Sequence, residues 1–466
     1  MPPELSVDRP QRPPIAWTPT SRRRVVAERR LAAESAQKTH DQLASTASLL
    51  EHDSAAVRLT AVRALVHLAD EEPAYRQACI AALCSVLRAM PVPRPDDDRR
   101  GGEQWRAWRG DRACRHAILS VIAARLRPEA TISWRGYDLD FSGVTFESGA
   151  PSPASADSQH ESAGSQHESA GNQHESAGNP AGFTGPGLTG ARVSFAGAEF
   201  AGGQVSFAGA TFAAAEVSFA GATFAGARVS FAGATFAAGE VSFAGVTFAA
   251  GEVNFAGAEF SGAKVTLLGA EFAGGAVSFA GAEFSGGKVS FCCRFTGGAV
   301  AFLGSRFTGG AVNFLGAEFT GGQVDFLDAE FASGQVGFVG AVFAGSEVSF
   351  IGAEFGGATV SFVGAKFELG MVSFVGADFT GGEVRFPWTE FSGSEVRFSG
   401  ANFDGGQMGF AQAKFSGGEV DFTSVHFSRG LVDFSGALLW SAPPSFDDWA
   451  ASHTACLRLP ARYMVA

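Results

Sequence analysis

Regularly spaced glutamates are the side chains of this sequence that could do chemistry. They recur in columns through the repetitive part of the chain, and paired carboxylates can act as general acid and general base. The same part contains Lys264, Arg294 and Arg306, and such mixing of charges is typical of a solvated face. We therefore interpret the carboxylates as a candidate acidic face and predict no catalytic pair. The candidates for this face are Glu259, Glu271, Glu283, Glu318 and Glu330.

Histidines and cysteines form two candidate metal or redox groups. His160, His167 and His174 recur in QHESAG-type copies that are too polar to be buried, so nothing would hold the imidazoles in place. Cys292 and Cys293 are adjacent where the repeat loses one residue, which favours a local packing variant. Neither a phosphate-binding loop nor a Ser-His-Asp arrangement is found. The sequence therefore predicts no metal, no cofactor and no catalytic residue, as in a protein that is not an enzyme.

A twelve-residue unit must position all of these side chains. It reads VSFAGAEFAGGQ from Val193, and near copies follow as far as Val432. A short, regular period indicates a solenoid of stacked layers. A small or β-branched residue stands two positions before each phenylalanine, and this alternation is typical of a short strand with both of these side chains pointing inward. The predicted inward ladder includes Val193, Val205, Val217, Phe195, Phe200, Phe207, Phe212, Phe219 and Phe224.

Each unit consists of two five-residue pieces, such as VSFAG and AEFAG, followed by an extra pair. The pieces, with a central Phe195 or Phe200 and a small residue two positions earlier, resemble the pentapeptide repeat family. The resemblance covers Leu139 to about Trp440 apart from an insertion, and it implies a right-handed, four-sided β-helix. The extra pair departs from the family's plain pattern and predicts about 24 residues per coil, with roughly ten coils spanning about 50 Å.

The composition divides the chain into six segments. We expect a disordered N-terminus at 1–20, a helical domain at 21–138 with a linker near 91–102, a first repeat unit at 139–149, a low-complexity disordered insertion at 150–180, the β-helix at 181–440 and a C-terminal cap at 441–466. The fold class is mainly β, a β-helix solenoid preceded by a small α-helical domain. The helical domain is expected to cover the first layer of the solenoid.

Apolar residues with helical spacing predict three helices in the N-terminal domain. They are expected over 55–69, from about 72 to 90, and from Trp105 to Leu126. A further helix is predicted from Phe446 to Leu457. The stretch VRLTAVRALVHLADEEP also resembles the helical segment that precedes pentapeptide repeats in many actinobacterial proteins, most of which have no assigned activity.

The charge distribution restricts the partners of this chain. It has 466 residues and a net charge of −12, and the acidic excess lies in the repeats. An acidic surface repels phosphates, which disfavours direct nucleic acid binding by the repeats. We find neither a signal peptide nor a membrane-spanning stretch, and the six cysteines lack the spacing of a disulfide framework. We therefore expect a cytoplasmic protein with reduced thiols and no membrane contact.

These observations favour a non-enzymatic scaffold, a rigid rod that binds another protein through a face or an end. The sequence does not identify the partner, and a homodimer through an end of the solenoid is one assembly that fits. The alternative, implied by a subset of the pentapeptide repeat family, is a DNA mimic that binds a type II topoisomerase such as DNA gyrase. A third hypothesis is regulatory DNA binding by the basic run Ser21–Arg30, although such runs are usually solvated faces.

Overall fold

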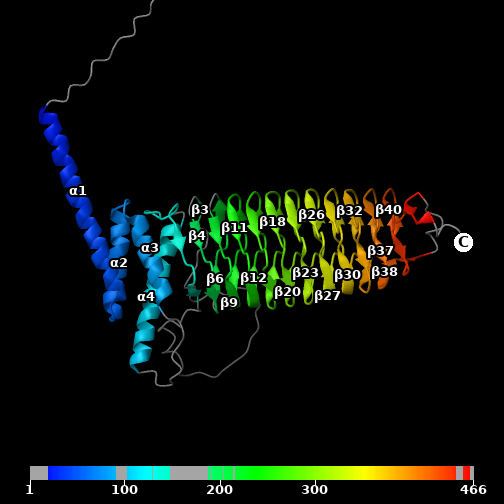
Figure 1. Ribbon diagram of the computed structural model, residues 1–466, viewed down its shortest axis with the longest axis horizontal. Coiled ribbons are helices and arrows are strands. Elements are labelled where there is room, and N and C mark those ends of the chain that lie inside the picture. The colour runs from blue at the N-terminus through cyan, green and yellow to red at the C-terminus, as the bar shows by residue number, and fades with distance from the viewer. Residues whose placement is uncertain are drawn as a thin grey trace, which may run out of the picture.

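The computed structural model describes residues 19–90, 102–127, 130–146, 187–189, 192–202, 204–213, 216–447 and 455–461. Figure 1 shows helices packed at one end of a long solenoid whose coils follow one another to the C-terminal end. The predicted fold class, a β-solenoid with about 24 residues per coil behind a helical domain, is confirmed. The two segments predicted to be disordered lie outside the described residues, except that the first helix already begins at Pro19.

The N-terminal domain consists of α1 (Pro19–Ser48), the 3-10 turn η1 (Leu49–Glu51), α2 (Ala55–Glu71), α3 (Arg76–Ala89) and α4 (Glu103–Leu126). Apolar residues at helical spacing bury one side of α2, α3 and α4 around Leu65, Leu83 and Ile122. These three helices occupy the segments in which helices were predicted. α1 is exposed over most of its described side chains and extends away from the rest of the domain (Figure 1).

Strands from successive coils form four parallel ladders, which we number 1 to 4 in the order in which the chain visits them. Ladder 1 consists of β1 (Leu139–Asp140), β4 (Arg192–Ser194), β8 (Glu216–Ser218), β11 (Glu240–Ser242), β14 (Lys264–Thr266), β18 (Lys288–Ser290), β22 (Ala311–Asn313), β26 (Gln335–Gly337), β29 (Thr359–Ser361), β32 (Glu383–Arg385), β36 (Gln407–Gly409), β40 (Leu431–Asp433) and β43 (Leu457–Arg458). Ladder 2 consists of β2 (Thr145–Phe146), β5 (Glu199–Phe200), β9 (Thr223–Ser230), β12 (Thr247–Asn254), β15 (Glu271–Phe272), β19 (Arg294–Phe295), β23 (Glu318–Phe319), β27 (Val342–Ser349), β30 (Lys366–Ser373), β33 (Glu390–Phe391), β37 (Lys414–Phe415) and β41 (Leu439–Trp440).

Ladder 3 consists of β6 (Gln204–Ser206), the second halves of β9, β12, β27 and β30, and β16 (Ala276–Ser278), β20 (Ala299–Ala301), β24 (Gln323–Asp325), β34 (Glu395–Arg397), β38 (Glu419–Phe422) and β42 (Ser445–Phe446). Ladder 4 consists of β3 (Gly187–Thr189), β7 (Thr211–Ala213), β10 (Thr235–Phe236), β13 (Glu259–Phe260), β17 (Glu283–Phe284), β21 (Arg306–Phe307), β25 (Glu330–Phe331), β28 (Glu354–Phe355), β31 (Asp378–Phe379), β35 (Asn402–Phe403) and β39 (His426–Phe427). The four long strands run around the corner between ladders 2 and 3 and so join these two ladders.

The pairing register shows that alternate twelve-residue units stack on one another. Val193 pairs with Val217 and Phe236 with Phe260, offsets of 24 residues. One coil therefore contains two units, and each unit supplies two sides of a four-sided layer. Because neighbouring parallel strands lie about 4.8 Å apart, equivalent side chains of successive coils form straight columns along the solenoid.

Stacked phenylalanine rings fill the interior of the solenoid. Phe326 stacks on Phe302 and Phe350 with ring centroids 4.6 and 4.7 Å apart, and it meets Phe338 of the opposite half-coil edge to face at 6.1 Å. Such aromatic pairs contribute about 0.5–1.5 kcal/mol each beyond the burial of their area. The residues that the sequence places inward are all buried: Val193, Val205, Val217, Phe195, Phe200, Phe207, Phe212, Phe219 and Phe224.

The missing residue near the cysteine pair shortens one corner and leaves the ladders intact. Three residues separate Phe291 from Phe295, where other units have four. The backbone N–H of Cys293 donates to the carbonyl oxygen of Phe291 at 2.9 Å, which closes the corner in a tighter turn. Phe295 still pairs with Phe272 below it and Phe319 above it. The deletion is tolerated because corner residues take no part in the strand register.

The two ends of the solenoid are built differently. At the N-terminal end, Arg115 of α4 donates to the carbonyl oxygens of Leu87 and Thr145, and Arg88 of α3 forms an ion pair with Asp140 at 2.9 Å. At the C-terminal end, the predicted helix from Phe446 to Leu457 is wrong at both of its ends. β42 and β43 occupy these positions and extend ladders 3 and 1, while residues 448–454 lie outside the described part.

Candidate functional site

Buried thiols are the nucleophilic groups of the core, and burial makes them unreactive. It raises the pKa of Cys79 and of Cys84 to about 11, and it raises the pKa of Cys293 well above its ordinary value. The reactive form of cysteine is the thiolate. At neutral pH these side chains are therefore protonated and act as small apolar groups in the packing.

The candidate metal groups of the sequence are not assembled in the described structure. Within the described ranges, no three His, Cys, Asp or Glu side chains are placed to hold a metal ion. His160, His167 and His174 lie outside those ranges. Cys293 Sγ lies 3.2 Å from the carbonyl oxygen of Phe291, and Cys292 Sγ lies 3.2 Å from Ser290 Oγ, so local contacts hold both side chains of the shortened corner.

The five glutamates of the candidate acidic face lie on two different sides of the solenoid. Glu259, Glu283 and Glu330 belong to ladder 4, where alternate units stack. Glu271 and Glu318 belong to ladder 2. Since the chain visits the ladders in the order 1, 2, 3, 4 around a four-sided coil, ladders 2 and 4 are opposite sides, and these glutamates form two columns.

Ladder 4 carries the longer acidic column, and one cation interrupts it. Arg306 lies between Glu283 and Glu330, and its Nε donates to Glu330 Oε2 at 3.0 Å. The hydrogen bond to Glu330, together with the nearby carboxylates, raises the pKa of Arg306. Beyond this ion pair the column continues with Glu354 and Asp378. Carboxylates spaced by one coil in this way face solvent and offer no recess in which a substrate could be held.

Ion pairs between neighbouring coils neutralise part of the acidic surface. Their side chains are largely exposed, so salt screens them and their contribution to stability is small. The pairs that join one coil to the next are Arg192–Glu216, Arg228–Glu252, Lys264–Glu240, Arg294–Glu318, Arg306–Glu330, Arg429–Asp404 and Arg458–Asp433. The net charge of the repeats is thus distributed over mixed columns on all sides.

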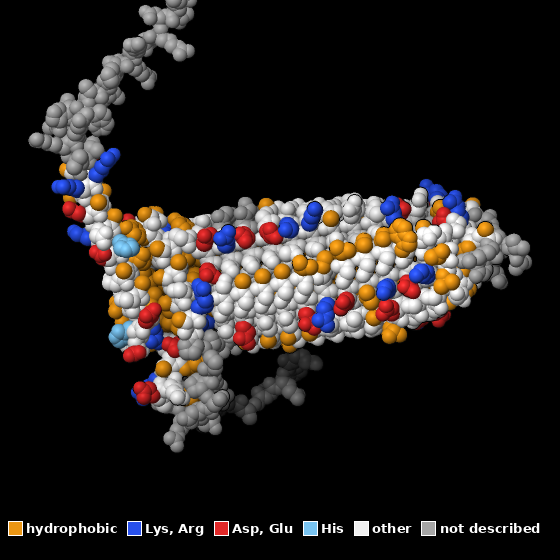
Figure 2. Space-filling model, viewed as in Figure 1, with side chains coloured by type: hydrophobic (Ala, Val, Ile, Leu, Met, Phe, Trp, Pro, Cys, Tyr) orange, Lys and Arg blue, Asp and Glu red, His pale blue; other side chains and the backbone are white. Residues whose placement is uncertain are grey.

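An apolar stripe runs along the corner between ladders 1 and 2. The residue that follows the first phenylalanine of the unit is alanine in the early coils and a larger apolar residue in the later ones. Leu268 and Leu315 are 61% and 50% exposed, and Trp388 at the end of the stripe is 64% exposed. We call this corner stripe the set Leu268, Cys292, Leu315, Val339, Val363, Pro387 and Trp388. Figure 2 shows a hydrophobic band along the solenoid with rows of charged side chains on both sides of it.

Sequence reasoning did not find the corner stripe. Its members are about 24 residues apart, and each one looks like an ordinary variation of a small residue within its own unit. The available signal was the change from alanine to a larger apolar residue after the first phenylalanine of the unit, which in every second unit falls at this corner and in the others, as at Leu303 and Ile351, at the opposite corner. It becomes visible only when the sequence is written with one coil per line.

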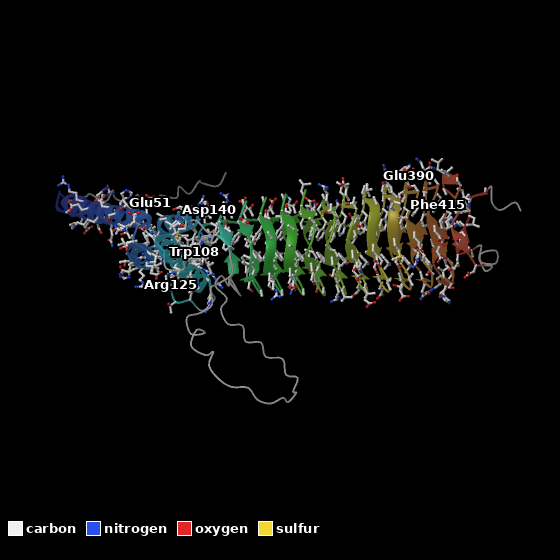
Figure 3. All side chains as sticks on the ribbon, turned by 90° about the horizontal axis from the view of Figure 1, so that it is seen from below. Glu51, Trp108, Arg125, Asp140, Glu390 and Phe415 are labelled. Atoms are coloured by element: carbon white, nitrogen blue, oxygen red, sulfur yellow. The ribbon has the colours of Figure 1, made fainter. Side chains whose placement is uncertain are left out.

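The helical domain contains a recess. An open groove of about 530 Å³ lies between α2 and α4, lined by Leu59, Val66 and Val121 and by the polar Arg63, His67 and His116. Beneath it, Asp70 accepts hydrogen bonds from Arg125 Nε and Trp134 Nε1, both at 3.1 Å. Figure 3 shows Arg125 and Trp108 on the helices beside the solenoid, with Asp140 at the junction and Glu390 on the outer edge of a distant coil. Ser120 also lines the groove, and His67 Nε2 lies 3.2 Å from Glu71 Oε1.

Comparisons with known proteins leave the relationships of the chain open. No family model matches it, and no curated protein matches it. Among α1 to α4, the helices that the structure describes, none has the length and apolarity that crossing a membrane requires.

Proposed function

We propose that the protein is a non-enzymatic scaffold of the pentapeptide repeat type that binds other proteins through its long surfaces. The observation that carries this proposal is the environment of the side chains that could be reactive. The described core thiols are buried and protonated, while the carboxylates of the repeats form solvated columns with cations interspersed. The outer surface of the solenoid is then the part available for interaction. It is straight, about eleven coils long and held rigid by the ring stacks.

The assignment to the pentapeptide repeat type is supported by the interior. Two five-residue pieces per unit, each with a central phenylalanine, place four ring columns inside a four-sided coil. The extra pair in each unit turns a corner, which accounts for the longer coil without changing the inward pattern. We place this scaffold in the cytoplasm, where its thiols would stay reduced.

One feature favours a second candidate function, binding to a type II topoisomerase such as DNA gyrase as a DNA mimic. Glu330, Glu354 and Asp378 present carboxylates on three successive coils of ladder 4. A supercoiling assay with purified gyrase and the full chain tests this candidate. Inhibition that Glu354→Lys abolishes would support it, and unchanged supercoiling at high protein concentration would eliminate it.

The scaffold proposal is tested by capture with surface variants of the full chain. The wild-type protein, immobilised through a tag, is compared with Glu354→Lys on ladder 4 and with Arg63→Glu on the helical groove. Circular dichroism checks that both variants remain folded. We expect a partner that binds the wild type, is lost with Glu354→Lys on the solenoid and is retained by Arg63→Glu on the helical domain. If each variant retains the same proteins as the wild type, or if nothing binds, these surfaces are not the interaction sites of a scaffold.

A further inference from the structure

The outward column of ladder 2 has a sign pattern that reverses about its centre. In seven successive strands of this ladder, β15 to β37, the first residues follow in the order Glu271, Arg294, Glu318, Val342, Lys366, Glu390 and Lys414, and each pairs in register with the next. Their charges are minus, plus, minus, zero, plus, minus and plus. Reading the column from the opposite end gives the opposite sign at every position, with the apolar Val342 in the middle.

A column with this property is complementary to a second copy of itself running in the opposite direction. If a two-fold axis passes beside Val342, Glu318 faces Lys366 of the other copy and Arg294 faces Glu390. At the ends of the column, Glu271 faces Lys414. Ion pairs within one chain explain only part of the pattern. Arg294 and Glu318 form one at 3.5 Å, whereas Lys366 and Lys414 have no ion-pair partner among the described residues.

The complementarity is lost when the second copy shifts by one coil. Sliding the second copy by one coil in one direction brings Arg294 against Lys366 and Glu271 against Glu390. Sliding it the other way brings Glu318 against Glu390. In a parallel arrangement each charge would face its own copy. Like charges that face each other across an interface suppress wrong arrangements, so the column disfavours the parallel arrangement and shifts by one coil.

Neighbouring columns are centred on the same coil. Val339 of the corner stripe lies three residues before Val342, and a two-fold axis there sets Leu315 against Val363 of the second copy. In ladder 1, on the adjacent side of the coil, Lys288 and Glu383 lie two coils to either side of Gln335 with uncharged residues between them, but this side does not face its copy when ladder 2 does. An apolar centre with matched charges around it is the usual anatomy of a protein interface.

We propose that two copies of this chain associate side by side and antiparallel, through ladder 2 and the corner stripe, about a two-fold axis at Val342. This proposal goes beyond the proposed function because it names a partner, a second copy, and a surface that differs from the solenoid end. Six steps of about 4.8 Å separate Glu271 from Lys414, so the matched column is about 29 Å long. With a width of about 20 Å, the projected contact is about 600 Å², on the scale of interfaces that bury roughly 800 Å² of accessible surface per partner.

The full chain is tested by size-exclusion chromatography with light scattering. We expect a dimer for the wild type. Glu318→Lys and Lys366→Glu each place like charges opposite one another twice in the dimer, so each is expected to weaken the dimer by roughly 100-fold or more. An equimolar mixture of the two variants regains both attractive pairs and should form a heterodimer. The double variant Glu318→Lys/Lys366→Glu should again dimerise with itself.

Glu330→Lys is the matched control. It breaks the ion pair Arg306–Glu330 on ladder 4, as Glu318→Lys breaks Arg294–Glu318 on ladder 2, and it should leave the dimer unchanged. Circular dichroism of each variant excludes unfolding as the cause of a monomer. A monomeric wild type would overturn the proposal. A dimer that survives both single charge reversals would also overturn it, because the contact would then lie elsewhere, such as at a solenoid end. A mixture of the two variants that stays monomeric would overturn it as well.

Discussion

Glycines occupy two kinds of corner in this solenoid, and they are needed for different reasons. Gly257 has a φ of +64°, but a side chain there would meet nothing within 4 Å. The equivalent corner position holds Trp388 at a φ of 53° and Gln412 at 60°, so larger residues do occur there. Gly262 has no such freedom, because a Cβ would lie 2.2 Å from the carbonyl oxygen of Ala237 in the coil below. The first kind of glycine relieves backbone strain, and the second lets successive coils approach.

Gly262→Ala should therefore destabilise the protein more than Gly257→Ala. Gly257→Ala should lower the free energy of unfolding by about 1–2 kcal/mol, because an alanine there must adopt the left-handed conformation. Gly262→Ala must push the backbones of two neighbouring coils apart, and such overpacking costs about 1–3 kcal/mol or more. Because Ala263 follows Gly262, that corner has no second glycine with which to adjust. Thermal unfolding of both variants measures the difference, and equal losses would show that coil spacing does not depend on this glycine.

The buried thiols make the stability of the helical domain sensitive to alkaline pH. Burial raises the pKa of Cys79 and Cys84 from 9.0 to about 11, so the folded state keeps protons that the unfolded chain releases. Their contribution is fully present below pH 9 and is lost as the pH rises to about 11. Denaturant unfolding should show a steeper loss of stability between about pH 9 and about pH 11 for the wild type than for Cys79→Ala/Cys84→Ala. Parallel pH profiles for the two proteins would contradict this assignment.

At the scale of elements, the ring stack is the unit of stability, and the chain contains its own control. Leu267 replaces a phenylalanine in one stack and is still 3% exposed, so a leucine can occupy a ring position. Phe326, in another of the four stacks, contacts rings above, below and beside it. We therefore expect the stability of the stack to depend more on filling the volume of each ring position than on having an aromatic ring in every coil.

Phe326→Ala should cost about 3–5 kcal/mol, as expected for removing a buried ring and leaving a cavity. Phe326→Leu should cost much less, because it repeats the packing at Leu267. Denaturant titrations of the two variants give the comparison. If leucine is as damaging as alanine, ring stacking itself stabilises the coil, and Leu267 must be compensated by its neighbours.

Much of the whole molecule could be predicted from the sequence, and the failures have a common cause. Valine and phenylalanine spacing gave the strands and the interior, and the extra pair after each second pentapeptide gave the coil length. The predicted coil of 24 residues already implied that Glu259, Glu283 and Glu330 align, whereas Glu271 and Glu318 were grouped with them although they lie half a coil away on ladder 2. The C-terminal helix failed because Phe446 and Leu457 extend ladders whose other strands lie one coil earlier in the chain. Contacts between coils, which local patterns do not contain, decided each of these cases.

The two ends of the molecule should differ in local stability. In a solenoid each layer is stabilised by its neighbours, so unfolding begins at the less covered end. The N-terminal coil is held by Arg115 and Arg88 of the helical domain, whereas at the other end Phe427, the last described ring of ladder 4, is only half-buried. Hydrogen exchange followed by mass spectrometry should show faster exchange in β39 and β40 than in β25 and β26, with protection rising toward the centre. Arg115→Met serves as the comparison, because it should raise exchange in β1 and β2 and leave β39 unchanged. Uniform exchange along the wild-type solenoid would mean that the coils open together, and nearest-neighbour stacking would not describe this protein.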